Sequence, residues 1–555
     1  MYKYLKNYVI LFLLFNCLVY VFTQTNSPES VFNFHVINNA TAIEIIEYNG
    51  SSTNVVIPRI IQNLPVTHIG QEAFSEKELV SVIIPNSVIS IGFRAFADNR
   101  ISNINIPDSI KTIDSLAFCN NHLTNIIIPA NLVNIQGWPF ADNPIINITV
   151  DKSNPAYIVI DNYIMSKDTK KLIAYFGSEL QIIIPNHIKT IGNWSLSITH
   201  LKSVTIPNGV TIIGEGAFAF NNLEKIIIPN SVTTIGREAF SNNQLTEIII
   251  PNSVITIGEG AFSSNKLENI RIPNSISIIE DRTFENNQLA SINIPKTIIT
   301  IGQYAFESNK LTSIIIPTSV ISIGERAFSF NNIRNVTIPN SVDYIGKRAF
   351  WSNSLVNLTI PNSITIIEEG VFCNNNITSV VIPNTVTKIG DFAFERNQLV
   401  SLDIPNSVIY IGNQAFSHNQ LENITIPNSV TYIGPWAFSD NRLINVNIPN
   451  SVTVIEGGAF SDNKLISISI PSSITVVNGS TFMNNQLTSI TIPSNIAEIG
   501  NIAFAENPLI NIRIGNNVMI ANNSFGYLSN FFSIYNGRAG VFTRSNANSA
   551  NWVRQ

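Results

Sequence analysis

Regularly spaced prolines constrain this chain more than any other feature of its sequence. From Pro185 a proline recurs every 22 residues as far as Pro493, and an earlier run with the same spacing is Pro85, Pro107 and Pro129. A fixed period of about 20–30 residues is typical of a solenoid, in which each turn is one small unit stacked on its neighbours. The 555 residues are therefore expected to form many turns rather than several globular domains.

Each repeat carries apolar residues at fixed distances from its proline, which we number position 0. In the repeat around Pro251 they occupy positions −6, −3, −1, +3 and +6: Leu245, Ile248, Ile250, Val254 and Ile257. Positions −6 to −1 are rich in β-branched residues and their apolar side chains alternate, which predicts a short strand. Proline has no N–H to donate to a ladder, so it is expected to end that strand.

Phenylalanine at position +11 and asparagine at position +14 are expected to form columns through the stack. The asparagine side chains are expected to face inward at a bend, where an amide can both donate to and accept from backbone groups. Both columns are interpreted as structural rather than catalytic. Their first members in the long run of repeats are Phe218, Phe240 and Phe262, and Asn221, Asn243 and Asn265.

Glycine at position +7 marks a corner in most repeats. Asp114, Glu280 and Glu456 hold this position in other repeats, and glutamate has no preference for a positive φ. The corner is therefore not expected to need left-handed backbone. The Ala-Phe segment that follows is too short for a helix of its own, so a turn or a 3₁₀ segment is expected there.

The motif Leu-x-x-Ile-x-Ile-Pro-Asn-Ser-Val-x-x-Ile-Gly-x-x-Ala-Phe-x-x-Asn resembles the BspA-like class of leucine-rich-repeat proteins, from about Val55 to about Phe525. The resemblance implies a mainly β leucine-rich-repeat solenoid of 22-residue turns, with a parallel β-sheet on one side and short turns or 3₁₀ segments on the other. Members are typically secreted or displayed on the surface of bacteria and some protists, and several look like adhesins.

Four parts are expected along the chain. Residues 1–23 have the features of a signal peptide, because Lys3 and Lys6 precede an apolar run that is short for a membrane span. Residues 24–54 lack the repeat and are expected to form an N-terminal β cap, since the apolar face of a terminal turn has no neighbour to cover it. The solenoid itself is expected at residues 55–514.

The repeat spacing is interrupted once within the solenoid. An irregular, hairpin-bearing turn is expected at residues 144–184, with apolar strands at 157–161 and 171–176. Residues 515–555 are expected to form a C-terminal cap, in which an Asn-Gly pair at 536–537 suits the turn of a hairpin.

The sequence offers no constellation for catalysis, for a metal ion or for a cofactor. None of the six histidines belongs to a metal-ligand pair or lies beside a carboxylate cluster. Cys119 and Cys373 lie many turns apart, so no disulfide is expected between them. The net charge is −5 and there is no basic stripe, which argues against a nucleic-acid partner.

The side chain at position −2 is expected to point outward, because strand alternation directs its two apolar neighbours inward. A row of exposed isoleucines would form an apolar strip of the kind that often marks an interface. Alternatively, β-branched residues at this position serve only to stabilise the strands. The candidate binding face comprises Thr205, Ile227, Ile249, Arg271, Asn293, Ile315, Thr337 and Thr359.

Three functions remain open from the sequence. The first is a non-catalytic secreted or cell-surface protein that mediates adhesion to an extracellular protein, or to a host or neighbouring cell surface. The second is a repetitive structural or antigenic surface component without a specific ligand. The third is a carbohydrate-active enzyme on a β-solenoid, which would need charged residues to converge in adjacent turns. Contact with a membrane is expected only through the N-terminal leader, if that leader is uncleaved or lipidated.

Overall fold

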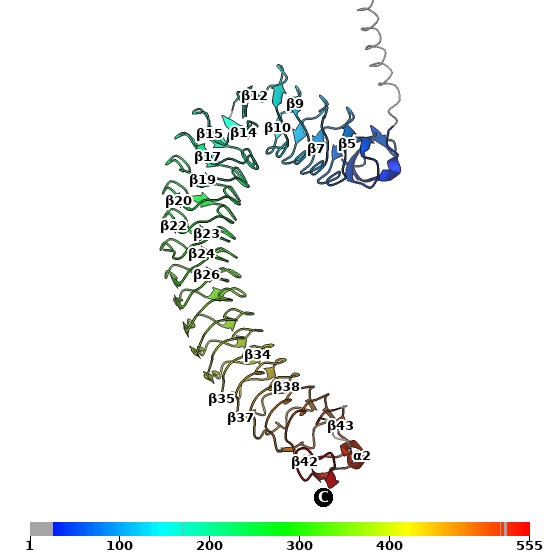
Figure 1. Ribbon diagram of the computed structural model, residues 1–555, viewed down its shortest axis with the longest axis vertical. Helices are drawn as coiled ribbons and strands as arrows, with labels where there is room; N and C mark the ends of the chain where they lie inside the picture. Colours follow the sequence, from blue (N-terminus) through cyan, green and yellow to red (C-terminus); the bar gives the residue numbers. More distant parts are fainter. Residues whose placement is uncertain (1–25, 169, 522, 527–529) are drawn as a thin grey trace, which may run out of the picture. The chain divides into compact units, whose positions relative to one another are not determined.

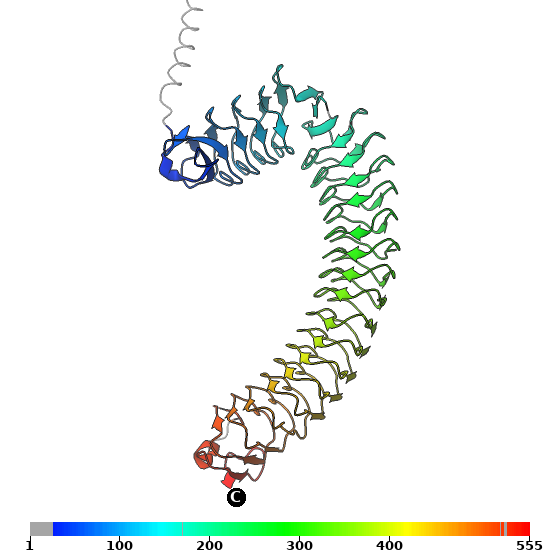
Figure 2. The same ribbon diagram turned by 180° about the vertical axis from the view of Figure 1, so that it is seen from behind.

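The computed structural model describes residues 26–168, 170–521, 523–526 and 530–555. The signal peptide expected at 1–23 lies outside the described residues. The chain divides into two compact units, one ending at Gln244 and the other beginning at Leu245, and each is described by itself. Within each unit the chain winds into successive solenoid turns that contain short β-strands (Figures 1 and 2). The predicted mainly β solenoid of 22-residue turns is confirmed.

A regular turn holds two short strands, where the sequence analysis expected one. The first strand occupies positions −4 to −2, and the second occupies positions +5 and +6. Within each unit, strands of the same kind pair in parallel in adjacent turns, as β25 with β27 and β24 with β26. In Figure 1 the second unit carries β20 and β22 along one side of its coils and β23, β24 and β26 along another.

The first strands have the following bounds. In the first unit they are β3 (Asn54–Val56), β6 (Ser81–Ile83), β9 (Asn125–Ile128), β11 (Asn147–Val150), β15 (Gln181–Ile183) and β17 (Ser203–Thr205). In the second unit they are β20 (Glu247–Ile249), β22 (Asn269–Arg271), β25 (Ser313–Ile315), β27 (Asn335–Thr337), β29 (Asn357–Thr359), β31 (Ser379–Val381), β33 (Ser401–Asp403), β35 (Asn423–Thr425), β37 (Asn445–Asn447), β40 (Ser489–Thr491) and β42 (Asn511–Ile514).

The second strands form the other row of each unit. In the first unit they are β5 (Leu64–Ile69), β7 (Ser90–Ile91), β8 (Thr112–Ile113), β10 (Asn134–Ile135), β16 (Thr190–Ile191), β18 (Ile212–Ile213) and β19 (Thr234–Ile235). In the second unit they are β21 (Thr256–Ile257), β23 (Ile278–Ile279), β24 (Thr300–Ile301), β26 (Ser322–Ile323), β28 (Tyr344–Ile345), β30 (Ile366–Ile367), β32 (Lys388–Ile389), β34 (Tyr410–Ile411), β36 (Tyr432–Ile433), β38 (Val454–Ile455), β39 (Val476–Val477), β41 (Glu498–Ile499) and β43 (Met519–Ile520).

The remaining elements lie outside the regular turns. They are the 3₁₀ helix η1 (Glu29–Val31), β1 (Phe32–Ile37), β2 (Ala42–Tyr48), β4 (Ile60–Ile61), β12 (Tyr157–Ile160), β13 (Tyr163–Ser166), β14 (Lys171–Tyr175), the helix α2 (Phe531–Tyr535), β44 (Gly540–Thr543) and β45 (Val553–Arg554). The Ala-Phe segments of the regular turns are hydrogen-bonded turns rather than 3₁₀ helices.

The core of each unit contains a column of stacked phenylalanine rings. In the first unit the ring centroids of Phe218 and Phe240 lie 5.1 Å apart, with their planes 5° from parallel. In the second unit, neighbouring rings from Phe262 to Phe525 lie 5.4–5.9 Å apart. Each ring is buried, so stacking joins these turns through hydrophobic contact at the same place in each, whereas Leu196 holds the position in the turn of Pro185.

The residues at position +7 do not adopt left-handed backbone in any turn that the structure describes. This agrees with the expectation drawn from Glu280 and Glu456. Left-handed φ values occur instead at positions +9 and +13, where most residues are not glycine: Arg348 has φ 55° and Ser352 has φ 53°. A left-handed residue other than glycine costs roughly 1–2 kcal/mol. Here the N–H groups of these residues donate to the carbonyls of Glu369 and Cys373 in the following turn.

The ends of the solenoid are covered differently. Strands β1 and β2 pair antiparallel and β2 pairs in parallel with β5, so residues 32–48 continue the second-strand sheet. The ring of Tyr48 stacks on Phe74 at 5.5 Å and begins the aromatic column. At the far end, Phe531 packs against Phe525 at 5.3 Å and against Trp552 at 5.5 Å.

Two expectations about the irregular segments were wrong in detail. Residues 157–176 form three antiparallel strands rather than two, because β13 lies between β12 and β14. The Asn-Gly pair at 536–537 is not the turn of a hairpin. It follows helix α2 with positive φ at both residues, and β44 then pairs antiparallel with β42. The helix makes this pair a helix end rather than a strand connection.

Candidate functional site

Strand alternation separates the residues of each first strand into buried and exposed sets. Ile248 and Ile250 are buried in the core, whereas Ile249 between them is 79% exposed. The first strands are three or four residues long and pair with those of adjacent turns, so this alternation is fixed by the sheet. The exposed row at position −2 is called the first-strand face below.

All eight residues proposed for binding are exposed in the structure: Thr205, Ile227, Ile249, Arg271, Asn293, Ile315, Thr337 and Thr359. The first two lie in the first unit and the other six in the second. Sheet pairing places Ile249 beside Arg271, Arg271 beside Asn293, and Ile315 beside Thr337. The second unit therefore brings most of these side chains into one row.

Two other large side chains at position −2 are missing from the predicted binding face. Ile127 and Ile183 in the first unit are exposed to a similar degree. They obey the same rule of position, counted from Pro129 and Pro185. Applying that count to every proline would have found them.

A hollow of about 510 Å³ interrupts the first-strand face in the second unit. It lies where residues 291–293 make only one β-bridge, to Arg271, instead of a regular strand between β22 and β25. Its lining includes Ser291, Asn293, Lys296 and Ile315. The hollow thus offers apolar contact from isoleucine and proline, with hydrogen-bonding groups at its edge.

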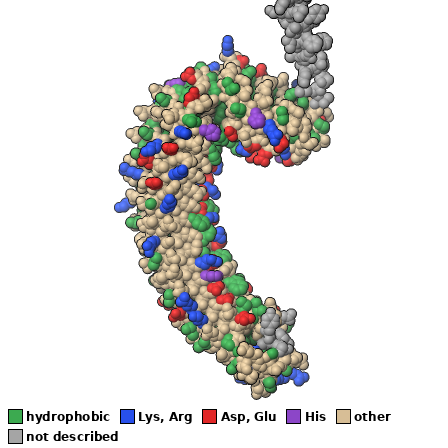
Figure 3. Space-filling model, in the orientation of Figure 1, with side chains coloured by type: hydrophobic (Ala, Val, Ile, Leu, Met, Phe, Trp, Pro, Cys, Tyr) green, Lys and Arg blue, Asp and Glu red, His purple; other side chains and the backbone are tan. Residues whose placement is uncertain are grey.

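On the face that Figure 3 shows, Lys, Arg, Asp and Glu side chains lie singly or in small groups over largely uncharged surface. Among the eight candidates only Arg271 is charged. No group of three or more His, Cys, Asp or Glu side chains within the described ranges could hold a metal ion. In that same part of the chain, no helix has the length and apolar character needed to cross a membrane.

The candidates for structural columns lie in the interior, away from this face. Asn243 is buried, and its side-chain nitrogen lies 2.8 Å from the carbonyl oxygen of Phe218 and 3.2 Å from that of Phe240. Its side-chain oxygen accepts the N–H of Leu223 at 3.0 Å. Asn221 makes equivalent contacts, and Asn265 accepts the N–H of Leu245 at 3.1 Å. These amides join backbone groups of neighbouring turns and offer nothing to a ligand.

Comparison with known families gives one match over most of the chain. The sequence model described as "BspA type Leucine rich repeat region (6 copies)" matches residues 46–170, 174–289, 256–378, 365–487 and 454–537. A search of curated proteins found no match.

Solved structures of leucine-rich-repeat proteins share the fold. A leucine-rich repeat protein from Bacteroides ovatus is 23% identical, with 75% of this chain and 91% of that chain covered and a TM-score of 0.41. YopM from Yersinia enterocolitica is 15% identical, with 85% and 91% covered and a TM-score of 0.46. A leucine rich cell surface protein from Faecalibacterium prausnitzii is 22% identical, with 74% and 91% covered and a TM-score of 0.26.

Proposed function

The chain belongs to the BspA-type leucine-rich-repeat family, and we propose that it is a non-catalytic, secreted or cell-surface protein that binds other proteins through its first-strand face. The observation that carries this proposal is the exposure of large β-branched side chains at position −2. Ile315 is 76% exposed, and the adjacent turns hold the polar residues Asn293 and Thr337 at the same position.

The rigidity of the first-strand face favours binding. Its side chains project from short strands whose backbone is paired to the adjacent turns, so a partner need not order a loop. Ordering mobile segments is one of the main costs of association, and a face that is already ordered avoids it. The same regularity spaces the side chains one strand apart, roughly 4.8 Å, which suits an extended, flat contact.

The hollow beside Ile315 suits the anchor of such a contact. Binding energy in protein interfaces concentrates in a few side chains that fill pockets on the partner. The hollow is large enough for one aromatic or aliphatic side chain and is bordered by Asn293 and Lys296, which can hydrogen-bond at its rim.

The proposed location outside the cell rests on the leader and on the family. Residues 1–23 have the basic start and apolar run of an export signal. The partners that fit this location are extracellular proteins, or proteins on a host or neighbouring cell, and the proposed role is adhesion.

A binding assay with matched variants tests the proposal. Surface plasmon resonance would measure binding of the full chain to immobilised fibronectin, laminin and collagen. Replacing Ile249 and Ile315 together by Thr is expected to weaken any such binding by about tenfold or more, because each change replaces a buried ethyl group by a hydroxyl. The control replaces Ile255 and Ile321 by Thr, since these isoleucines are also exposed but lie at position +4.

Two results would count against the proposal. One is equal weakening by both double variants, which would remove any special role for the first-strand face. The other is failure of the unaltered chain to bind any protein, including those on intact cells, which would favour a surface component without a ligand. Circular dichroism of each variant would establish that the solenoid is still folded.

A further inference from the structure

A second column, most of whose large side chains are half-buried, runs along the corner of the second unit at position +9. Its residues have left-handed backbone and carry large side chains in most turns, among them Arg282, Tyr304, Arg326, Arg348 and Phe392. We call it the corner column. Cationic and aromatic side chains contact each other along it: the guanidinium of Arg282 lies 4.9 Å from the ring centroid of Tyr304.

The residues at positions +12 and +13 extend these contacts. The guanidinium of Arg326 lies 5.3 Å from the ring of Trp351, and that of Arg348 lies 5.7 Å from the same ring. Phe330 meets Trp351 edge to face at 4.7 Å. The corner is thus a surface where planar side chains from successive turns lie against each other.

Glycine interrupts the corner column in a few turns. The side chain of the preceding turn covers some of these glycines and not others. At Gly458 the ring of Trp436 covers the glycine, because a Cβ there would lie 2.3 Å from a ring carbon. In the first unit Trp194 covers Gly216 in the same way, at 2.4 Å. At Gly370 no ring lies over the glycine, and the nearest atoms belong to the aliphatic stem of Arg348, 3.0 Å from the position of a Cβ.

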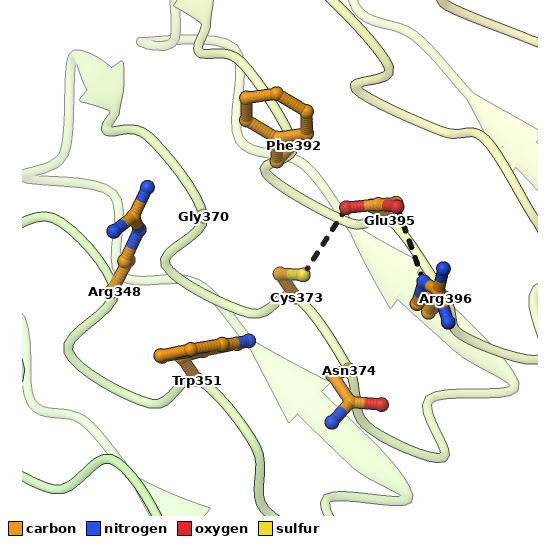
Figure 4. A pocket seen from close by; sticks show the side chains of 8 residues that line it. All are labelled: Arg348, Trp351, Gly370, Cys373, Asn374, Phe392, Glu395 and Arg396. Atoms are coloured by element: carbon orange, nitrogen blue, oxygen red, sulfur yellow. Dashed lines mark hydrogen bonds and ion pairs between the residues drawn. The ribbon is translucent and has the colours of Figure 1, made fainter.

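A hollow of about 490 Å³ is left at Gly370. Figure 4 shows it between Arg348 and Trp351 on one side and Phe392 and Glu395 on the other, with Cys373 at its centre. Phe392 and Arg348 belong to the turns on either side of Gly370. The hollow is the space that a side chain at position 370 would occupy.

The spacing of the turns sets the thickness of that space. In the core column beneath it, Phe350 and Phe372 are 5.9 Å apart, and Phe372 and Phe394 are 5.6 Å apart. A ring placed in the turn of Gly370 would therefore lie one ordinary stacking distance from its neighbours on both sides. A single planar group fits, and two would not.

The charged groups at the hollow are already paired. Arg348 contacts Glu369 at 2.6 Å, and Arg396 contacts Glu395 at 3.3 Å. The carboxylate of Glu395 also accepts a hydrogen bond from the thiol of Cys373, with 3.5 Å between sulfur and oxygen. A free anion or cation would have to displace one of these partners. A neutral ring would not, because it can pack against the guanidinium and aromatic groups while their ion pairs stay intact.

We propose that the hollow at Gly370 is a binding site for one neutral aromatic side chain, tyrosine or tryptophan, of a partner protein. The partner's ring takes the place of the side chain that Gly370 lacks, between Arg348 and Phe392. This site lies on the corner column, not on the first-strand face, and it stands whether or not that face binds a ligand.

Saturation-transfer NMR on the full chain tests the proposal with N-acetyl-tyrosinamide as the probe and N-acetyl-leucinamide as its aliphatic counterpart. The ring protons of the tyrosine probe are expected to receive saturation, and the leucine probe is not. Gly370→Phe is expected to abolish the transfer, because the new ring fills the hollow. Phe392 has φ 59° at the equivalent position, so phenylalanine is compatible with the backbone there.

A second variant and a control make the result specific. Arg348→Trp is expected to cover Gly370 as Trp436 covers Gly458, and so to abolish the transfer by another route. Ser480→Phe adds the same ring at position +9 of a distant turn, where φ is 61°, and is expected to leave the transfer unchanged. Transfer that persists in Gly370→Phe and Arg348→Trp, or its absence in the unaltered chain, overturns the proposal. The double change of Ile249 and Ile315 to Thr is expected to have no effect on the probe.

Discussion

The side-chain nitrogen of Asn331 lies 2.9 Å from the carbonyl oxygen of Phe306, a residue of the preceding turn. The same amide donates to the carbonyls of Phe328 and Ser329 in its own turn, and its oxygen accepts the N–H of Leu311 at 3.0 Å. One buried side chain therefore satisfies backbone groups on both sides of a junction between turns. Asn309, Asn375, Asn397 and Asn419 make the same bond to the preceding turn.

Asn331→Ala is expected to loosen the junction between its turn and the preceding one. The change leaves the buried N–H of Leu311 without a partner, at a cost of about 1–3 kcal/mol, whereas the carbonyl of Phe306 keeps the side-chain amide of Asn309 as a donor. Native-state hydrogen exchange would show the amide of Leu311 exchanging at least tenfold faster. Asn332→Ala, which changes the exposed neighbour, is the control and is expected to leave that rate unchanged.

Phe328→Ala is expected to destabilise its part of the second unit by about 3–5 kcal/mol, because it removes a buried ring and leaves a cavity. The ring of Phe328 is fully buried and lies 5.4 Å from both Phe306 and Phe350. Phe330 lies two residues further on and is 41% exposed, so Phe330→Ala is expected to cost far less. Thermal unfolding followed by circular dichroism would compare the two, and equal effects would contradict the importance of the column.

Gly346→Ala is expected to destabilise the solenoid by roughly 1–3 kcal/mol, the usual cost of forcing an extra group into packed structure. A Cβ at Gly346 would lie 2.4 Å from the backbone nitrogen of Glu325. At Gly515 the nearest atom to a Cβ is 3.5 Å away, and φ is not left-handed. Gly515→Ala is therefore expected to leave stability unchanged or to raise it by about 0.4–1 kcal/mol. Urea unfolding midpoints would rank the two variants.

Alkylation of Cys373 is expected to accelerate steadily with pH and to continue past pH 9.0. Burial, and after it the carboxylate of Glu395, raise the pKa of the Cys373 thiol from 9.0 to about 12. The thiolate is the reactive form. Mass spectrometry of the peptide that contains Cys373, after timed exposure to iodoacetamide, would give the rate. A plateau near pH 9 in the folded protein would contradict the raised pKa.

The same shift has a defined effect on stability. Because the pKa of Cys373 is higher in the folded state than in the unfolded state, its contribution to folding is fully present below pH 9.0. It is lost as the pH rises from 9.0 towards 12, where the unfolded thiol ionises and the folded one does not. Cys373→Ser is expected to reduce the loss of stability across that interval.

The sequence was sufficient to predict the period, the first strand, the inward direction of isoleucine and phenylalanine, and the outward direction of position −2. Each of these follows from repetition together with strand alternation, and Ile248 and Ile249 illustrate both. The second strand was not predicted because it is only two residues long, as at Thr256–Ile257. A segment of that length is too short to show the alternation of a strand.

The left-handed residues at position +9 were also missed, for a physical reason. A positive φ is usually recognised by glycine, yet here Arg348, Phe392 and Trp436 adopt it. What stabilises the conformation is a hydrogen bond to the next turn, which a single repeat does not contain. Glycine at Gly370 and Gly458 was the available signal, because both share this position.

Strand β13 had a signal too: Asp161 and Asn162 between apolar residues suit a two-residue turn.

The hollow at Gly370 was beyond prediction from the sequence. It depends on how the position +9 side chain of the preceding turn is oriented. The ring of Trp436 covers Gly458, whereas only the aliphatic stem of Arg348 lies near Gly370. That choice follows from pairing of Arg348 with Glu369, a contact between neighbouring turns that only the assembled stack defines.

The hydrogen bonds at each corner run from one turn to the next: Arg348, Phe350 and Ser352 donate to Glu369, Val371 and Cys373. A force applied along the stack would pull on these bonds lengthwise and open one junction at a time. Each freed turn of 22 residues would extend by roughly 70–80 Å. A protein held between two surfaces would then lengthen in equal steps under load, instead of failing at a single point.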